Sequence, residues 1–166
     1  TENLPMGLVH ADIELKNIQD SNLEPVVVRS LVDTGALHLC IPEHVAIQLG
    51  VDFATADKRE VTIASGEKKL CPYVGPLQIG FGKRKCFSGA LVLGDEVPLG
   101  AIPMEDMDLI VHPARHALTV NPDAPNIPAS TVKGYALGEL LEGSEKIEKS
   151  PEDKAWLSDE PKGREA

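Results

Sequence analysis

The chain has 166 residues, of which 42% are hydrophobic, and its 26 acidic and 16 basic residues give a formal net charge of -10. This length and apolar content are enough for one domain with a core of its own. The negative charge argues against nucleic-acid and anionic-membrane binding, and no apolar run approaches the roughly 20 residues that a membrane-spanning helix needs.

The first 50 residues predict two strands and a short helix. Apolar and polar residues alternate from 9 to 16, which is the period of a strand with one exposed face. After a polar turn, the β-branched residues within 25–32 predict a strand that is covered on both faces. Residues 41–50 are typical of a helix with Pro42 in its first turn and Gly50 at its C-terminal cap.

Short strands dominate the rest of the domain. The pattern predicts a mostly β domain of seven or so strands with two short helices, which ends near Pro122. The further elements that we expect are strands at 59–64 and 70–81 around a polar turn, a strand at 85–94, a helix at 102–109, and strands at 108–113 and 116–122.

The composition divides the chain into segments. Proline recurs at 122, 125 and 128, which is typical of a linker after the domain. The residues that follow are rich in Glu, Lys, Ser and Pro and predict a disordered tail, in which only YALGELLEG is typical of a short helix. We therefore expect a cloning remnant at 1–5, before the first Met, a domain at 6–122, a Pro-rich linker at 123–133 and an acidic tail at 134–166.

The cysteines and histidines predict no disulfide framework and no metal site. Cys40, Cys71 and Cys86 form no CxxC pair, and no leader sequence precedes the domain, so we expect a cytoplasmic protein. His112 and His116 have the spacing of two ligands on one helix, but a proline between them would break that helix. No phosphate loop or dinucleotide fingerprint is present, and we expect no cofactor.

The triplet Asp33-Thr34-Gly35 directly follows the apolar strand, where a chain normally avoids an ion. A given triplet arises by chance in about a few per cent of chains of this length, so its setting carries more information than its letters. One interpretation is a turn in which Asp33 accepts backbone N–H bonds and Gly35 supplies a positive φ. The other is a catalytic carboxylate.

The surroundings of the triplet resemble the retroviral-like aspartic proteases of clan AA, particularly the bacterial members that are single small domains. The resemblance extends from Met6 to Lys133 and is carried by LVDTGA, a flap-like hairpin VTIASGEKKLCPYVGPLQI, a strand GALVLG, and PLGAIPMEDMDLIVHP. It implies a small closed β-barrel-like fold of the retropepsin type, with two short helices. It also implies a peptide or protein substrate.

The resemblance implies three groups of site residues. Asp33 would be catalytic. A second group would support it, namely Thr34, Gly35, Ala36, Leu99 and Gly100. Thr34 would form a hydrogen bond across a dimer. The triplet Pro98-Leu99-Gly100 would pack beside the loop, although its first position is usually aliphatic in the family. The flap that closes on the substrate would carry Ala64, Ser65, Gly66 and Glu67. His38 is near enough in sequence to line the cleft, although a surface or half-buried histidine is the more frequent outcome.

The chemistry of peptide hydrolysis predicts a homodimer. One carboxyl group cannot accept a proton from water and donate one to the peptide carbonyl at the same moment. Two adjacent carboxyl groups share one proton and can do both. Because the chain carries one Asp-Thr-Gly, the second must come from another copy, which places the site on a two-fold axis. We therefore predict an aspartic endopeptidase; the alternative is a catalytically idle dimeric binding module.

The tail has a second resemblance. YALGELLEG followed by EDKAWLSDEPKGREA is similar to the C-terminal arms of MazE-type antitoxins. This resemblance implies that residues 134–166 bind a protein partner such as a MazF-type toxin, with Trp156 in a pocket of that partner. A plain acidic tail explains the same residues.

Overall fold

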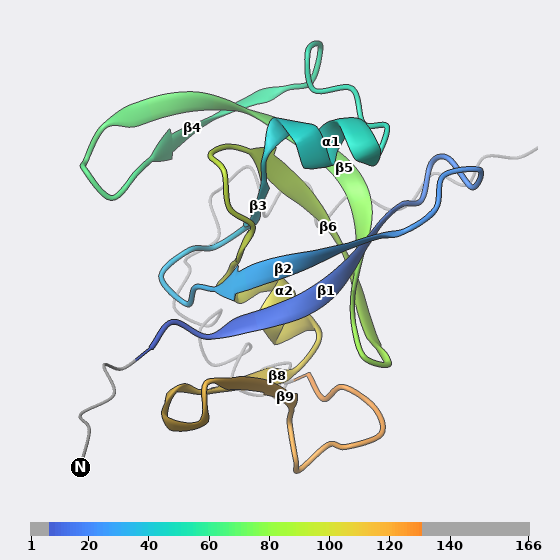
Figure 1. The fold of residues 1–166 in the computed structure, drawn as a ribbon, viewed down its shortest axis with the longest axis vertical. Helices are drawn as coiled ribbons and strands as arrows, with labels where there is room; N and C mark the ends of the chain where they lie inside the picture. Colours follow the sequence, from blue (N-terminus) through green and yellow to red (C-terminus); the bar gives the residue numbers. More distant parts are fainter. Residues whose placement is uncertain (1–6, 131–166) are drawn as a thin grey trace, which may run out of the picture. The chain divides into compact units, whose positions relative to one another are not determined.

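The protein is described by a computed structural model that covers residues 7–130 (Figure 1). These residues form nine strands, two α-helices and one 3-10 helix, which confirms the predicted mostly β class with two short helices. The expected remnant at 1–5 and the antitoxin-like tail at 134–166 lie outside the described residues. The elements are β1 (His10–Asn17), β2 (Val26–Val32), β3 (Leu39–Ile41), α1 (Glu43–Gln48), β4 (Lys58–Thr62), β5 (Lys68–Phe81), β6 (Arg84–Val92), β7 (Pro98–Leu99), α2 (Ala101–Asp106), β8 (Leu109–His112), η1 (Pro113–Arg115) and β9 (Ala117–Val120).

Seven strands form one sheet that curves until its ends nearly meet. The strand order is β3-β6-β5-β1-β2-β7, and β4 pairs with β5 outside this path. The pairs β2–β7 and β3–β6 are parallel, and the others in this sheet are antiparallel. Two hydrogen bonds connect the ends: the Ala101 N–H donates to the Ala36 carbonyl (2.8 Å), and the Ile102 N–H donates to the Leu37 carbonyl (3.0 Å). The sheet is therefore nearly a closed barrel.

Strand alternation builds the core inside this sheet. Ile13 and Leu15 of β1 are at most 1% exposed, and they pack with Leu77 and Ile79 of β5. Each such burial stabilises the fold by about 1.5–3 kcal/mol. The expectation that β2 is covered on both faces is wrong, because Val27 is 68% exposed on the outer face of the sheet.

The two α-helices are each six residues long. Pro42 is the N-cap of α1, and Gly50 follows its end with a φ of 64°, in the left-handed region that glycine adopts readily, as predicted. Helix α2 begins directly after Gly100 and ends at Asp106, earlier than the sequence predicts. In the described part of the chain, no helix is long and apolar enough to cross a membrane.

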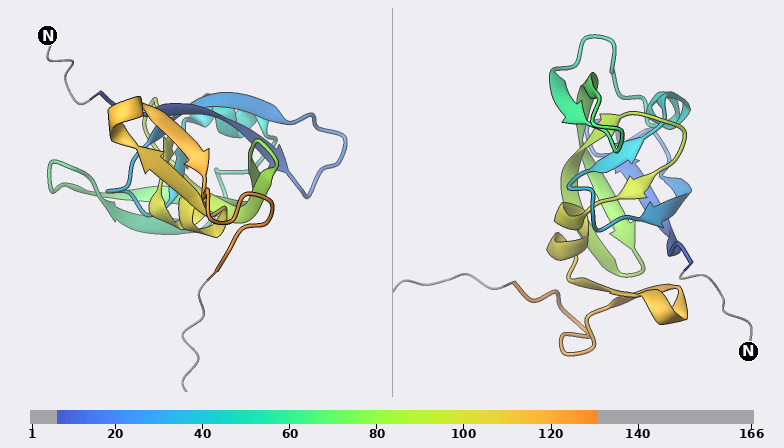
Figure 2. Two further views of the ribbon diagram at one scale, coloured as in Figure 1. Left: turned by 90° about the horizontal axis from the view of Figure 1, so that it is seen from below. Right: turned by 90° about the vertical axis from the view of Figure 1, so that its left-hand side faces the viewer.

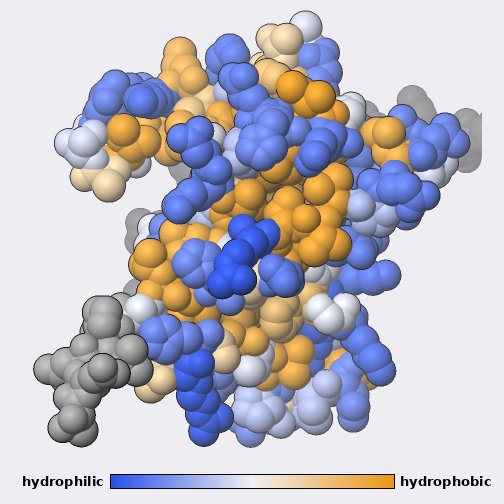
Figure 3. Space-filling view, in the orientation of Figure 1, coloured by the Kyte–Doolittle hydropathy of each residue, from blue (hydrophilic) through white to orange (hydrophobic). Residues whose placement is uncertain are grey.

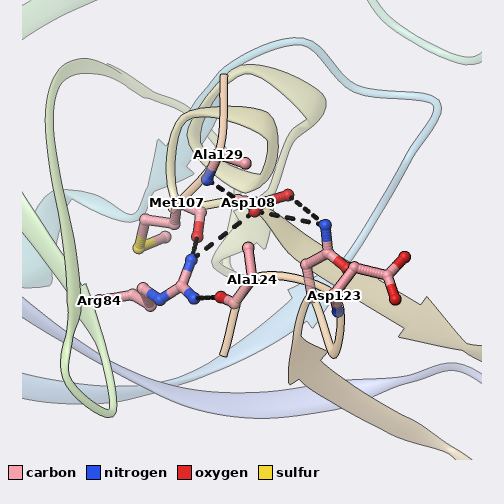
Figure 4. Close-up of polar contacts among 7 residues, drawn as sticks. Arg84, Met107, Asp108, Asp123, Ala124 and Ala129 are labelled. Carbon is pink, nitrogen blue, oxygen red and sulfur yellow. Dashed lines mark hydrogen bonds and ion pairs between the residues drawn. The ribbon is translucent and has the colours of Figure 1, made fainter. Parts of the chain in front are cut away.

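Strands β8 and β9 form a separate hairpin at the end of the sheet opposite the β4–β5 hairpin (Figures 1 and 2). A buried arginine connects this region to the sheet (Figure 4). Arg84, at the start of β6, is only 4% exposed; it donates to the carbonyls of Met107 (3.0 Å) and Ala124, and lies 3.9 Å from the Asp108 carboxylate.

Residues 123–130, which the composition predicts as part of a linker, contain no helix or strand. They are nevertheless attached to the domain at two points. The Ala124 carbonyl accepts from Arg84, and the Ala129 N–H donates to the Asp108 carboxylate (2.9 Å) (Figure 4). The domain contacts therefore continue beyond Pro122.

Candidate active site

Asp33 lies in the loop that leaves β2, where β7 holds the backbone in place. The Asp33 N–H donates to the Leu99 carbonyl (3.1 Å), which extends the β2–β7 pairing by one bond. One carboxylate oxygen, Oδ1, accepts the Gly35 N–H (2.9 Å). No other hydrogen bond to this carboxylate is made within residues 7–130, and the side chain is half-buried. The loop thus orients the carboxylate and leaves most of its acceptor capacity open.

Gly35 does not have a positive φ, so that part of the turn interpretation is wrong. Gly35 is absent from the positive-φ glycines of the described chain, whereas a Cβ on it would lie 3.2 Å from Asp33 Oδ1. The bond from Gly35 to Asp33 is common to the turn and the catalytic interpretations. The two interpretations therefore differ in whether the carboxylate has unused acceptor capacity and whether a cleft lies above it.

A buried layer beneath the loop fixes its position. The Ser30 hydroxyl is fully buried and donates to the Val97 carbonyl (2.8 Å), which ties β2 to the segment that enters β7. Leu99 is also fully buried. A Cβ on Gly100 would lie 2.5 Å from backbone atoms of Leu37 and His38, so only glycine allows the start of α2 to lie against the loop.

The β4–β5 hairpin carries the predicted flap residues at its tip. The Ile63 N–H donates to the Glu67 carbonyl (2.9 Å), and the Gly66 N–H donates to the Ile63 carbonyl (2.8 Å). Gly66 has a φ of 85°, which suits a tight hairpin with a left-handed residue. The predicted polar turn is therefore a hairpin end, at which Ala64, Ser65, Gly66 and Glu67 are all exposed.

A cleft of about 780 Å³ lies between this hairpin and the Asp33 loop. In the space-filling view the surface is hollowed between the two (Figure 3). Of the predicted site residues, the cleft brings together four, while Thr34 and the outer tip residues do not line it; the four are Asp33, Gly35, Ala36 and Ala64.

The sequence reasoning missed most of the cleft lining. The hairpin contributes Arg59 and Val61 of β4 and Ile63 directly after it, and β6 contributes Leu91. His38, whose position the sequence left open, also lines the cleft. The alternation of side chains along 59–63 was the available signal, but it does not say which face of a hairpin turns toward Asp33.

Two groups near Asp33 have shifted pKa values. Burial, with Cys71 and Asp33 nearby, raises the pKa of Cys40 to about 11, so Cys40 is a packed thiol and not a nucleophile at neutral pH. Partial burial, together with Arg59, lowers the pKa of His38 below its usual value. Among residues 7–130, no cluster of His, Cys, Asp or Glu could hold a metal ion.

The comparisons with known proteins give similar solved structures but no family assignment. The chain is similar to the retroviral protease-like domain of Ddi1 from Leishmania major, with 12% sequence identity and a TM-score of 0.46 over 70% of this chain and 91% of that chain. No family model matches the sequence. No curated protein matches it either.

Proposed function

We propose that the chain is a retropepsin-like aspartic endopeptidase that acts as a homodimer, with Asp33 of each copy at the reacting centre. The observation that carries the proposal is the Asp33 carboxylate itself. It stands at the end of a core strand, is oriented by the Gly35 N–H, and opens into a cleft roofed by a hairpin. A carboxylate that only closed a turn would not need a cleft above it.

No second carboxyl group among residues 7–130 is placed to share a proton with Asp33. The only other acid that lines the described cleft is Glu60, and its carboxylate pairs with Lys68 (2.9 Å). Asp33 thus has no intramolecular partner among residues 7–130 with which to share a proton. A second copy would supply it.

Exposed groups beside Asp33 support such a dimer. Leu37 is 64% exposed and Ile102 is 43% exposed, and the Ile102 N–H bonds to the Leu37 carbonyl, so the two lie together next to the loop. Thr34 is also exposed, and its hydroxyl makes no hydrogen bond within the described part of the chain. A partner loop packed here would cover the apolar groups and give Thr34 a bonding partner.

The reaction that follows needs no covalent intermediate with the enzyme. The ionised carboxylate of the dyad takes a proton from water as its oxygen attacks the peptide carbonyl, and the protonated one donates to the carbonyl oxygen. The carboxyl group that took the proton from water then gives it to the amine nitrogen as the C–N bond breaks, and the other carboxylate takes a proton back from a hydroxyl of the diol, which restores the dyad with one proton. The substrate lies extended between hairpin and cleft floor, where strand pairing satisfies its backbone groups.

The test is peptide cleavage by the full chain and by Asp33→Asn, measured by mass spectrometry on unfolded proteins in H₂¹⁸O. We expect the wild type to incorporate ¹⁸O into new carboxyl termini and Asp33→Asn to lose at least about 1000-fold in rate, because the amide cannot act as the base. Asp20→Asn is the matched control, since Asp20 accepts the Asn22 N–H (3.0 Å) in a similar turn elsewhere.

Light scattering establishes whether both variants remain dimers. Cleavage that survives Asp33→Asn in an intact dimer would refute the proposal. If the wild type is a dimer that cleaves nothing, the alternative of an idle binding module holds instead.

A further inference from the structure

Arg59 is the one basic residue of β4 that lines the Asp33 cleft. In the hairpin register Arg59 lies opposite Cys71, which is 3% exposed. Residues opposite each other in an antiparallel pair share a face. Arg59 is therefore on the inner face, and it lines the Asp33 cleft.

Aromatic and imidazole groups hold the Arg59 guanidinium in place. Its Cζ lies 3.8 Å from the centre of the Tyr73 ring, and its Nη1 lies 3.4 Å from His38 Nε2. The His38 ring meets the Tyr73 ring edge-on at 6.0 Å. Because the pKa of His38 is lowered, the imidazole is neutral at physiological pH and its Nε2 can accept from Arg59. The guanidinium is thus oriented before any ligand arrives.

Arg59 has no acidic partner in the described part of the chain. The two ion pairs found within residues 7–130 are Lys68 with Glu60 and Arg84 with Asp108. Apart from the contact of Nη1 with His38, the guanidinium N–H donors have no acceptor among residues 7–130. An oriented guanidinium with unused donors is suited to bind a carboxylate through two parallel hydrogen bonds.

We propose that Arg59 is a specificity-determining residue, which binds the carboxylate of a Glu or Asp side chain in the substrate. The inference rests on the proposed peptide cleft and names its substrate class. Apolar side chains of the same peptide fit the neighbouring wall, formed by Val61, Ile63 and Leu91. An extended peptide presents alternate side chains to one wall, so an acidic residue and apolar residues can both be accommodated.

The test measures binding by the full-length Asp33→Asn variant, so that substrate is not consumed. The probes are fluorescent decapeptides with Val, Leu or Phe in the central positions and either Glu or Gln at one scanned outer position. At one or more positions we expect the Glu peptide to bind about tenfold more tightly, the effect of one charge-assisted contact. The preference should shrink as salt is raised.

Three further substitutions in this background assign the effect to the guanidinium. Arg59→Gln should abolish the preference for Glu, and Arg59→Lys should retain only part of it, because lysine keeps the charge without the planar fork. Lys58→Gln is the matched control: it removes the same charge from the adjacent, exposed position of β4, which does not line the cleft. Equal affinity for every Glu and Gln pair, or an equal loss of preference in Lys58→Gln and Arg59→Gln, would overturn the inference.

Cleavage of the same peptides by the wild type separates this inference from the proposed function. If Glu peptides bind selectively but are not cut, Arg59 binds carboxylates and the proposed protease function is wrong. If peptides are cut at equal rates with Glu or Gln at every position, the protein is a protease and the proposed role of Arg59 is wrong.

Discussion

Replacing Gly100 with alanine tests whether the buried layer beneath the loop determines the geometry of Asp33. The added Cβ would lie 2.5 Å from the carbonyl carbon and oxygen of Leu37 and from the carbonyl oxygen of His38. Ordinary contacts of this kind are about 3.4 Å or longer, so one of the two segments must move by about 1 Å. Gly100 has a φ of -83°, which alanine adopts freely, and the effect is therefore steric alone.

The movement cannot be local, because hydrogen bonds tie the same two segments together. Ala101 and Ile102 donate to Ala36 and Leu37, at 2.8 and 3.0 Å. We expect Gly100→Ala to lower the free energy of unfolding by about 1–3 kcal/mol, as overpacking of a well-packed site does. If the proposed function is correct, a displacement of about 1 Å at the Asp33 loop should also lower kcat/KM about 100-fold.

Urea unfolding and cleavage of one peptide at fixed pH measure the two effects. Gly80→Ala is the control, since a Cβ there meets Glu14 Cβ at 3.6 Å, an ordinary contact, and Gly80 has no positive φ. If Gly100→Ala matches Gly80→Ala in both stability and rate, the loop does not depend on this close approach and the reasoning fails.

Two further predictions concern buried groups. Burial raises the pKa of Cys40 to about 11 and that of Cys86 to about 12. At pH 8 these thiols of the native protein should therefore react with iodoacetamide at least about 100-fold more slowly than those of the urea-unfolded protein, and the rate should rise with pH. Equal rates of modification, measured by mass spectrometry, would contradict the burial. Arg84→Met should lower the free energy of unfolding by about 3 kcal/mol, because it leaves the partly buried Asp108 without its counter-charge. Arg115 is exposed, and Arg115→Met should change this free energy by less than about 0.5 kcal/mol. Equal losses in urea unfolding would contradict the role of Arg84.

The elements that could be predicted from sequence are those that carry their own signal. Strand β1 alternates over a full strand length, and α1 has Pro42 and Gly50 at its ends, so both were predicted within a few residues. Strands β3 and β7 have only three and two residues, too few to show a period. They exist because distant partners, β6 and β2, pair with them in parallel, which no local pattern reports.

The same distinction explains which site residues were found. Asp33 stands out because a charge after an apolar strand is unusual wherever the chain folds. Arg59 does not, since an arginine in a hairpin is ordinary until the register places it opposite buried Cys71. Gly100 shows the limit most directly: it avoids close contact with Leu37 and His38, which only the fold brings to it, and it has no positive φ.

The cleft combines a fixed floor with a loosely held roof. Below Asp33, Ser30, Leu99 and Gly100 are buried and bonded, so moving the floor would break core contacts. The hairpin is exposed at every residue from 64 to 70, and its Lys68–Glu60 ion pair lies on the surface, where such pairs contribute about 0–1 kcal/mol. Opening the roof therefore costs far less than displacing the floor. The peptide cleavage that we propose would need this asymmetry, because a peptide would have to enter beneath the hairpin while the Asp33 carboxylate stays in place.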